Sequence, residues 1–395
     1  MRLEANAFEG MTSLRFLRFF YPRNEYGTIK IHVSYGGLHI LPNSLRWLIW
    51  HKFTAKSLPS TFSPDNLVTL SLRGSPVMER CWGYALQAKL VNLVWLDLSN
   101  CINLVAIPDL SWSSNLEYLY LQGCKSLTEL PCNVGDLDKL TRLDLSDCTN
   151  LRSLPANLNS KCLKDVRLSN CPKITSCPEI SSGELEVLDL TETPIIALPA
   201  AIYNIKQGGW LRLCGKHISN FLPISASLKV FRLCHTAMRE MDYYNDDDRQ
   251  QGSLPRFVRL ELVDNPQLKS LSRNIWKMVS QILILQDCQA IETLPRISQP
   301  LTGLTELRIR GCRNLKSFPT GINHLKSLQV LHFTGTGIKF LPELPSNLLN
   351  LDVSGCTLLQ ALPSNIGRLR WKELYFEDCP QEGTHLPQEI AYLLV

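Results

Sequence analysis

The sequence predicts an α/β solenoid, because leucine is abundant and recurs at one spacing. Of the 395 residues, 69 are leucine. The pattern LxxLxLxxC occurs in sixteen places, and most successive starts lie 20 to 26 residues apart. This spacing is typical of leucine-rich repeats, each of which contributes one short strand. We therefore expect a horseshoe with a concave parallel β-sheet and a convex side of loops, 3-10 turns and short helices.

The repeats cover nearly the whole chain. The clearest are LVWLDLSNCINLVAIP from Leu93, LEYLYLQGCKSLTELP from Leu116 and LTRLDLSDCTNLRSLP from Leu140. We expect a lead-in at 1–13, a repeat domain at 14–387 and a tail at 388–395. The repeats start at residues 14, 45, 67, 93, 116, 140, 163, 185, 208, 228, 257, 280, 304, 328, 348 and 371.

A single repeat is not expected to fold alone. Its inward apolar side chains contribute on the order of 10 kcal/mol. Ordering its residues costs about 1–2 kcal/mol each. Stacking supplies the difference, because strands pair with their neighbours and the leucines form a continuous column.

Position nine of each repeat, where the chain leaves the strand, is predicted to carry a structural ladder. A buried turn needs partners for its backbone groups, and thirteen repeats place a small hydrogen-bonding residue there. The exceptions, Pro22, Phe53 and Lys216, predict local irregularity. The predicted ladder residues are Ser75, Cys101, Cys124, Cys148, Cys171, Thr193, Thr236, Asn265, Cys288, Cys312, Thr336, Cys356 and Cys379.

The segments that follow the ladder predict an irregular convex side. Most repeats close with a Leu-Pro or similar pair, and proline cannot donate a backbone hydrogen bond to a central strand. PCNVGDLDKL and PTGINHLKSL are expected to form short helical turns.

Two insertions, at 21–40 and 241–252, lengthen the repeat. The second contains Asp246, Asp247 and Asp248. We interpret both as solvated loops, with a partner-contacting protrusion as the alternative. The aspartates lack the glycine and terminal glutamate of a calcium loop, so no metal is predicted.

Composition and motifs exclude several classes of protein. No stretch reaches the ~18 apolar residues of a membrane span. Glu4 and Glu9 lie where a signal peptide would need its apolar core, so no signal peptide is predicted. A formal charge of +5 without a basic block predicts no nucleic-acid partner. The fourteen cysteines form no CxxC pair, which favours a reducing compartment. Phosphate-loop, dinucleotide-binding, zinc-protease and nucleophile-elbow motifs are all missing from the sequence, so we predict no enzyme and no cofactor.

The concave face is the predicted contact surface. In LxxLxLx the leucines point into the core, so the side chains at positions three, five and seven should point to the inner rim of the arc, the concave face. Aromatic and arginine side chains are enriched in interface hot spots. Alternatively, the aromatic residues are there because they favour strands, and the arginines because they keep the exposed sheet soluble. Asp97, Asp144, Asp189 and Asp352 lie in the same rows. The predicted protein-binding residues are Trp47, Trp95, Tyr118, Tyr120, Arg142, Arg167, Trp210, Arg212, Arg232, Arg259, Arg308 and Arg310.

The first part of the chain resembles a known family. AFEGMTSLRFLRFF and the LRWLIW, SLPSTF and NLVTLSL elements, with Trp82 after them, are similar to the start of the repeat region in plant nucleotide-binding leucine-rich repeat immune receptors. They resemble the class with a Toll-like amino-terminal domain, the TIR-NBS-LRR disease resistance proteins. From Leu93 onward the resemblance is to the repeat pattern, LxLxxCxxLxxLP.

The resemblance implies a sensor in plant defense and signal transduction. In that family the repeats recognise a pathogen effector or a guarded host protein and restrain a nucleotide-binding switch. This chain has neither the NAD-cleaving Toll-like domain nor the nucleotide-binding domain. It is therefore expected to be a fragment or truncated product, or a short protein acting in trans. Neither Met1–Thr12 nor Gln388–Val395 clearly provides a polar cap, which favours truncation. We expect a cytoplasmic monomer that also reaches the nucleus, with a scaffold or adaptor, or an enzyme regulator, as alternatives.

Overall fold

The computed structural model describes residues 2–19, 32–33, 38–54, 58–76, 90–107, 109–203, 209–219, 228–241 and 256–380. These divide into two compact units, Met1–Ile202 and Tyr203–Val395. Most of both predicted insertions, Pro22, and the predicted tail at 388–395 lie outside the described residues.

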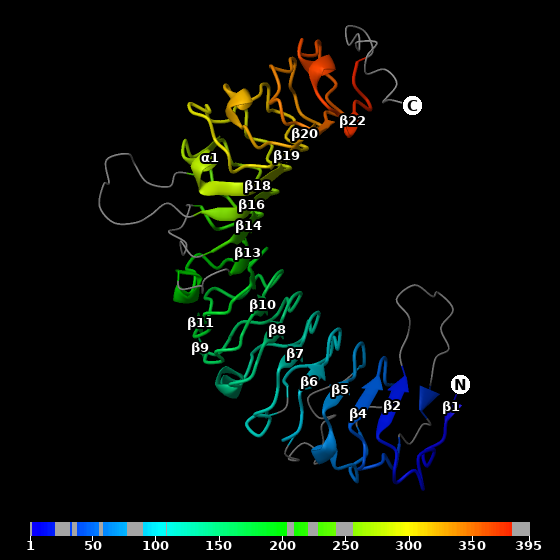
Figure 1. Ribbon diagram of the computed structural model, residues 1–395. Helices are drawn as coiled ribbons and strands as arrows, with labels where there is room; N and C mark the ends of the chain where they lie inside the picture. Colours follow the sequence, from blue (N-terminus) through cyan, green and yellow to red (C-terminus); the bar gives the residue numbers. More distant parts are fainter. Residues whose placement is uncertain are drawn as a thin grey trace. The chain divides into compact units, whose positions relative to one another are not determined.

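The first unit contains a parallel sheet whose strands follow the chain order (Figure 1). Each strand of this sheet begins two residues after a predicted repeat start, because the alternating part of LxxLxL is the segment that pairs. The strands are β2 (Phe16–Phe19), β4 (Trp47–Trp50), β5 (Thr69–Ser71), β6 (Trp95–Asp97), β7 (Tyr118–Tyr120), β8 (Arg142–Asp144), β10 (Asp165–Arg167) and β12 (Val187–Asp189).

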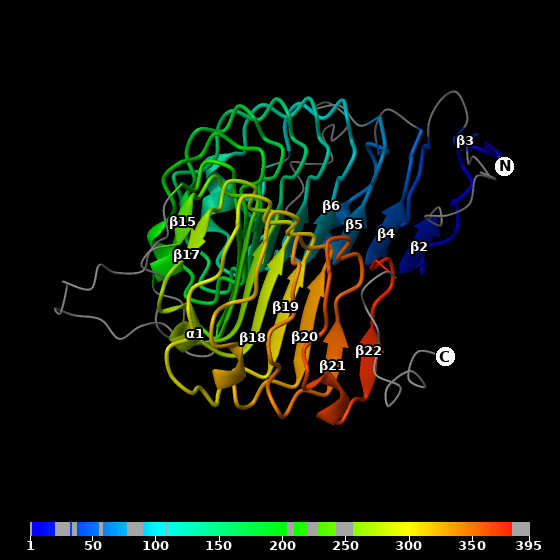
Figure 2. The ribbon, with the colours of Figure 1, turned by 90° about the horizontal axis from the view of Figure 1, so that it is seen from above.

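The second unit repeats this arrangement, and six of its strands are longer, with five to eight residues. Several of its strands lie side by side in Figure 2. The strands are again parallel and in chain order. They are β13 (Trp210–Cys214), β14 (Val230–Cys234), β16 (Phe257–Val263), β18 (Val279–Gln286), β19 (Glu306–Arg310), β20 (Val330–Thr334), β21 (Asn350–Asp352) and β22 (Glu373–Tyr375).

The core is the predicted column of apolar side chains behind each sheet. Leu96, Leu119, Leu143 and Leu307 are at most 1% exposed. Neighbouring members of the column are in register, as in the pairs Leu96–Leu119 and Leu119–Leu143. The predicted leucine-rich repeat solenoid is therefore confirmed.

In the described residues, the side of each unit away from the sheet consists of loops and 3-10 turns, with one short α-helix in the second unit. The two segments predicted to form helical turns do so, at η4 (Cys132–Asp136) and η6 (Ile322–His324). The other elements are η1 (Pro64–Asn66), η5 (Ala200–Tyr203), α1 (Ile275–Met278) and η7 (Ile366–Arg368). Within the described ranges, no helix has both the length and the apolar character needed to span a bilayer.

Three two-stranded parallel sheets were not predicted from the sequence. They form where loops of nearby repeats run side by side, and each strand has only two residues, too few to show an alternating pattern. The pairs are β1 (Arg2–Leu3) with β3 (His32–Val33), β9 (Asn157–Leu158) with β11 (Glu179–Ile180), and β15 (Glu240–Met241) with β17 (Ser270–Leu271).

Position eight makes the turn off the strand in a left-handed conformation. Among the described residues, fourteen position-eight residues have a positive φ, between 51° at Asp264 and 72° at Gly123. Glycine, asparagine and aspartate adopt this conformation most readily. The sequence carries that signal, since twelve of the sixteen repeats have one of these three residues at position eight.

The predicted ladder side chains are buried, apart from the half-buried Cys379, and most of them bond nearby backbone. Most of the cysteine thiols donate to a carbonyl in the preceding repeat, as Cys124 Sγ does to Leu98 O at 3.2 Å and Cys148 Sγ to Leu121 O at 3.1 Å. Asn265 Nδ2 donates to Leu233 O at 3.2 Å, while its Oδ1 accepts from the backbone N–H of Thr236. These bonds satisfy groups that the turn leaves without strand partners.

The irregularity predicted at Phe53 is wrong. Lys52 before it has the usual left-handed φ of 55°, and the Phe53 ring is buried, 5.0 Å from the Trp50 ring. The Phe53 N–H donates to Ser75 Oγ at 2.9 Å, so the next repeat supplies the missing partner. At Lys216 the turn does differ, because Gly215 before it lacks the positive φ of the other repeats.

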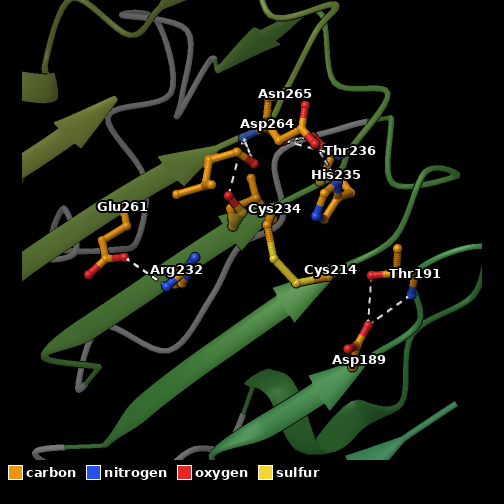
Figure 3. Close-up of a disulfide and its surroundings, with 12 residues drawn as sticks. Asp189, Thr191, Cys214, Arg232, Cys234, His235, Thr236, Glu261, Asp264 and Asn265 are labelled. Atoms are coloured by element: carbon orange, nitrogen blue, oxygen red, sulfur yellow. Dashed lines mark hydrogen bonds and ion pairs between the residues drawn. A yellow bond between two sulfur atoms is a disulfide. The ribbon is translucent and has the colours of Figure 1, made fainter. Parts of the chain in front are cut away.

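One pair of cysteines forms a disulfide that the sequence analysis did not anticipate. Cys214 and Cys234 are register partners on β13 and β14, with Cα atoms 4.5 Å apart (Figure 3). Both occupy position seven, not position nine. Eleven other cysteines in the described part of the chain are free thiols.

We expect alkylation to separate the thiols into two classes. In the native protein, iodoacetamide should modify the exposed Cys132 and Cys162 quickly and the buried ladder thiols slowly. Burial raises the pKa of Cys101 to about 11 and that of Cys171 to about 12, so little reactive thiolate is present near neutral pH. Mass spectrometry of timed samples measures both classes. Denaturation should make all of them react, and native labelling of Cys171 as fast as Cys132 would contradict the fold.

Candidate protein-recognition surface

The candidate contact surface is the side of each sheet that points away from the leucine core. It is formed by the side chains at positions three and five of the repeats, and we call it the sheet face. Strand alternation places these side chains opposite the leucine column. Trp47 is 47% exposed and Trp210 is 38% exposed. Position seven was also expected to lie on this face. That expectation is wrong at Ser99 and Ser146, whose side chains are buried.

Three aromatic rings form a cluster on the sheet face of the first unit. The ring centroids of Trp95 and Tyr118 are 4.9 Å apart, and those of Trp95 and Tyr120 are 4.8 Å apart. The Arg142 guanidinium lies 5.3 Å from the Tyr120 ring centre, within range of a cation–π interaction. Burial raises the pKa of Tyr120, so its hydroxyl stays protonated and can donate a hydrogen bond.

Asp165 links two of the predicted arginines. Its carboxylate lies 3.3 Å from Arg142 Nε and accepts bonds from Arg167 at 2.9 and 3.1 Å. The bond from Asp165 raises the pKa of Arg167. The two guanidinium groups are therefore held in place and partly neutralised before any partner binds.

A hollow of about 480 Å³ lies over this part of the sheet. Its lining is mixed in charge, with Arg73, Arg142 and Arg167 beside carboxylates such as Asp97. The hollow is open and mostly polar, which suits side chains of a protein partner better than a small apolar ligand.

The position-five aspartates mainly stabilise the ends of the strands. Asp97 Oδ1 accepts the Ser99 N–H at 2.9 Å, and Asp144, Asp189 and Asp352 accept the N–H two residues ahead in the same way. Asp144 is only 7% exposed. These carboxylates contribute less to contact than their place in the rows suggests.

In the second unit, glutamates pair with several of the predicted arginines. Glu261 pairs with Arg259 and lies 3.4 Å from Arg232 (Figure 3). Arg308 pairs with Glu306 at 2.8 Å. On the sheet face of this unit, Arg232, Arg259 and Arg308 therefore each have an acid within 4 Å.

Arg310 Nη2 lies 3.3 Å from His332 Nδ1 on the neighbouring strand. Burial lowers the pKa of His332, so this ring is neutral near pH 7. A neutral ring nitrogen can accept a hydrogen bond from the guanidinium.

The structure groups the predicted residues by unit. The Trp47 ring makes an edge-to-face contact with Phe16, with ring centroids 5.3 Å apart, and lies outside the cluster around Trp95. The set in the first unit is Trp47, Trp95, Tyr118, Tyr120, Arg142 and Arg167; the set in the second unit is Trp210, Arg212, Arg232, Arg259, Arg308 and Arg310.

Sequence reasoning missed the acids that organise the arginines. Asp165 and Glu306 occupy position three and Glu261 occupies position five, so the repeat register places all three on the sheet face. The detectable signal is an acid one strand away from an arginine, or two residues from it on the same strand.

The kinds of side chain on the sheet face favour the binding of a protein. Within the described ranges, no three His, Cys, Asp or Glu side chains are arranged to hold a metal ion. The sheet face offers large aromatic rings and forked arginine donors, which are enriched in protein–protein interfaces.

Comparisons with known proteins agree with the resemblance read from the sequence. No family profile matches the chain. The disease resistance-like protein DSC1 of Arabidopsis thaliana is 33% identical over 387 residues, which cover 92% of this chain and 30% of that protein. The Arabidopsis disease resistance protein RPS6 is 31% identical over 96% of this chain and 31% of its own length. The chain thus spans about a third of the length of these relatives.

Among solved structures, the functional domain of InlJ from Listeria monocytogenes matches with a TM-score of 0.48 and 18% identity. The match covers 83% of this chain and 66% of the InlJ chain.

Proposed function

Because the chain is homologous to plant disease resistance proteins along more than nine-tenths of its length, we propose that it is the protein-recognition module of a plant immune receptor. The repeats would act as the sensor, and the sheet face would be the contact surface. The partner would be a pathogen effector or a host protein that effectors target.

The observation that best supports this proposal is the aromatic cluster with its paired arginines. The Trp95 ring contacts both Tyr118 and Tyr120, and Asp165 lies 3.3 Å from Arg142 on the next strand. Preorganised aromatic and arginine side chains lose little conformational entropy on binding. Such side chains dominate the energetics of measured protein interfaces.

The rest of the receptor mechanism is part of the same proposal. In a full-length receptor, the repeats would restrain a nucleotide-binding domain in cis until the partner binds. We propose that the module works as a monomer, in the cytoplasm and also in the nucleus. The solenoid serves as an interaction scaffold and performs no chemistry of its own.

Alanine substitution on the sheet face tests the proposal. Two-hybrid screens against a pathogen effector library and a host leaf library would supply a partner, whose affinity is then measured by calorimetry. Of Trp95→Ala, Tyr118→Ala, Trp210→Ala and Arg212→Ala, at least one should weaken binding by more than about 1 kcal/mol. Unchanged affinity for all four variants would exclude the sheet face as the contact surface.

The same experiment separates the alternatives. Partners drawn only from host housekeeping proteins would favour a general adaptor. NAD cleavage by the purified chain would contradict a purely binding role.

A further inference from the structure

Arg212 differs from the other arginines of the sheet face in its surroundings. Among the residues that the structure describes, no acid or other side chain pairs with it. Its Nε is buried without an acceptor, as are those of Arg142, Arg232 and Arg308, but each of those three has an acid nearby. By contrast, Arg142 and Arg167 share Asp165, and Arg232 and Arg259 share Glu261. Arg212 is thus a half-exposed cation without a counterion in the described structure.

A second arginine, only partly neutralised by an acid, lies beside Arg212 on the neighbouring strand. β13 and β14 are in register, so Arg212 lies directly beside Arg232, about one strand spacing of 4.8 Å away. Arg232 is only 3.4 Å from Glu261 and shares that acid with Arg259. Like charges in directly opposite positions destabilise a sheet, so an added carboxylate at this point would be favourable.

An apolar contact lies next to this charge. Trp210 is two residues before Arg212 on the same strand, so both side chains project from the same face. Val230, the register partner of Trp210, is half-buried beside it. The surface therefore offers a cation and an indole ring about 7 Å apart along the strand.

We propose that Trp210, Arg212 and Arg232 bind an acidic protein segment, with an Asp or Glu carboxylate on Arg212 and an apolar side chain of the same segment on Trp210. The inference rests on the proposed protein-recognition function and names the chemistry of the partner. A nucleic acid fits less well, because Glu261 and Glu306 lie on the same face and would repel a continuous line of phosphates.

A selection from a library of random 12-residue peptides, displayed on phage, tests this directly against the full chain. Enriched peptides should carry an Asp or Glu within two residues of an aromatic or aliphatic side chain. Arg212→Glu should weaken their binding by about tenfold or more, because it replaces an attraction with a repulsion. Arg212→Lys should retain most of the affinity.

Arg273→Glu is the matched control, since Arg273 is exposed and lies next to α1, away from the strands of the sheet. This change should leave peptide affinity within about twofold of the original, because rim and distant charges contribute little. Circular dichroism melting curves show that each variant is folded. Arg212→Gln provides a second, milder loss of charge.

Three outcomes would overturn the inference. They are enrichment of peptides without acids, equal binding by Arg212→Glu, and Arg212-dependent binding of single-stranded DNA or heparin but not of acidic peptides. If peptides bind and only Trp95→Ala or Tyr118→Ala weakens them, the recognition function stands and this inference fails. If no peptide or two-hybrid partner depends on any sheet-face residue, both fail.

Discussion

Replacing Leu143 with alanine is expected to lower the free energy of unfolding by about 2–5 kcal/mol. Leu143 is 1% exposed and lies between its register partners Leu119 and Val166 in the apolar column. Truncation removes buried apolar surface and leaves a cavity that neighbouring repeats cannot close, because their backbones are fixed by strand pairing on both sides. Urea unfolding followed by circular dichroism measures the change.

Arg142→Ala is the control on the same strand. Arg142 points to the opposite face and pairs with Asp165 at a partly exposed position, so its removal should cost about 1 kcal/mol or less. A loss for Leu143→Ala no larger than that for Arg142→Ala would contradict the assignment of the two faces.

Gly321→Ala is expected to destabilise the second unit by about 2–4 kcal/mol. Gly321 has a φ of 85° at the start of η6, and a Cβ there would lie 2.2 Å from the backbone oxygen of Ile297. A left-handed conformation alone costs an alanine about 1–2 kcal/mol. The clash is with backbone, so a loop must also move.

Gly335→Ala separates these two causes. Gly335 also has a positive φ, 60°, but the nearest atoms to its Cβ would be 3.7 Å away. The Gly335→Ala variant should therefore lose only the free energy of unfolding that the left-handed conformation costs an alanine, about 1–2 kcal/mol. Equal losses for the two glycine variants, measured by urea unfolding, would show that the contact with Ile297 is unimportant.

The repeat pattern was sufficient to predict the fold because a solenoid depends on local spacing. Each LxxLxL segment determines its own strand and inward side chains, so register follows from aligning the repeats. Features that involve only two residues, such as β9 and β11, have no periodic signal. The turn at Phe53 could not be predicted from its own repeat, because its partner, Ser75, comes from the next one.

The candidate site was only partly predictable. Position numbers placed Trp95, Tyr118 and Arg142 on one face correctly, since alternation decides the face of a strand residue. The pairing of Arg142 and Arg167 with Asp165 depends on side-chain conformations, which the pattern does not specify. The lack of an acidic partner for Arg212 among the described residues depends in the same way on where the acids beside the other arginines lie.

The most direct test of the account is hydroxyl-radical footprinting of the chain with and without its two-hybrid partner. Oxidation of exposed aromatic side chains is quantified by mass spectrometry, and Trp112, which is 54% exposed and lies outside the strands of the sheet, serves as the internal reference. The bound partner is expected to protect Trp95, Tyr118 or Trp210 from oxidation and to leave Trp112 unchanged. Protection of Trp112 with none at the sheet-face aromatics would contradict this expectation.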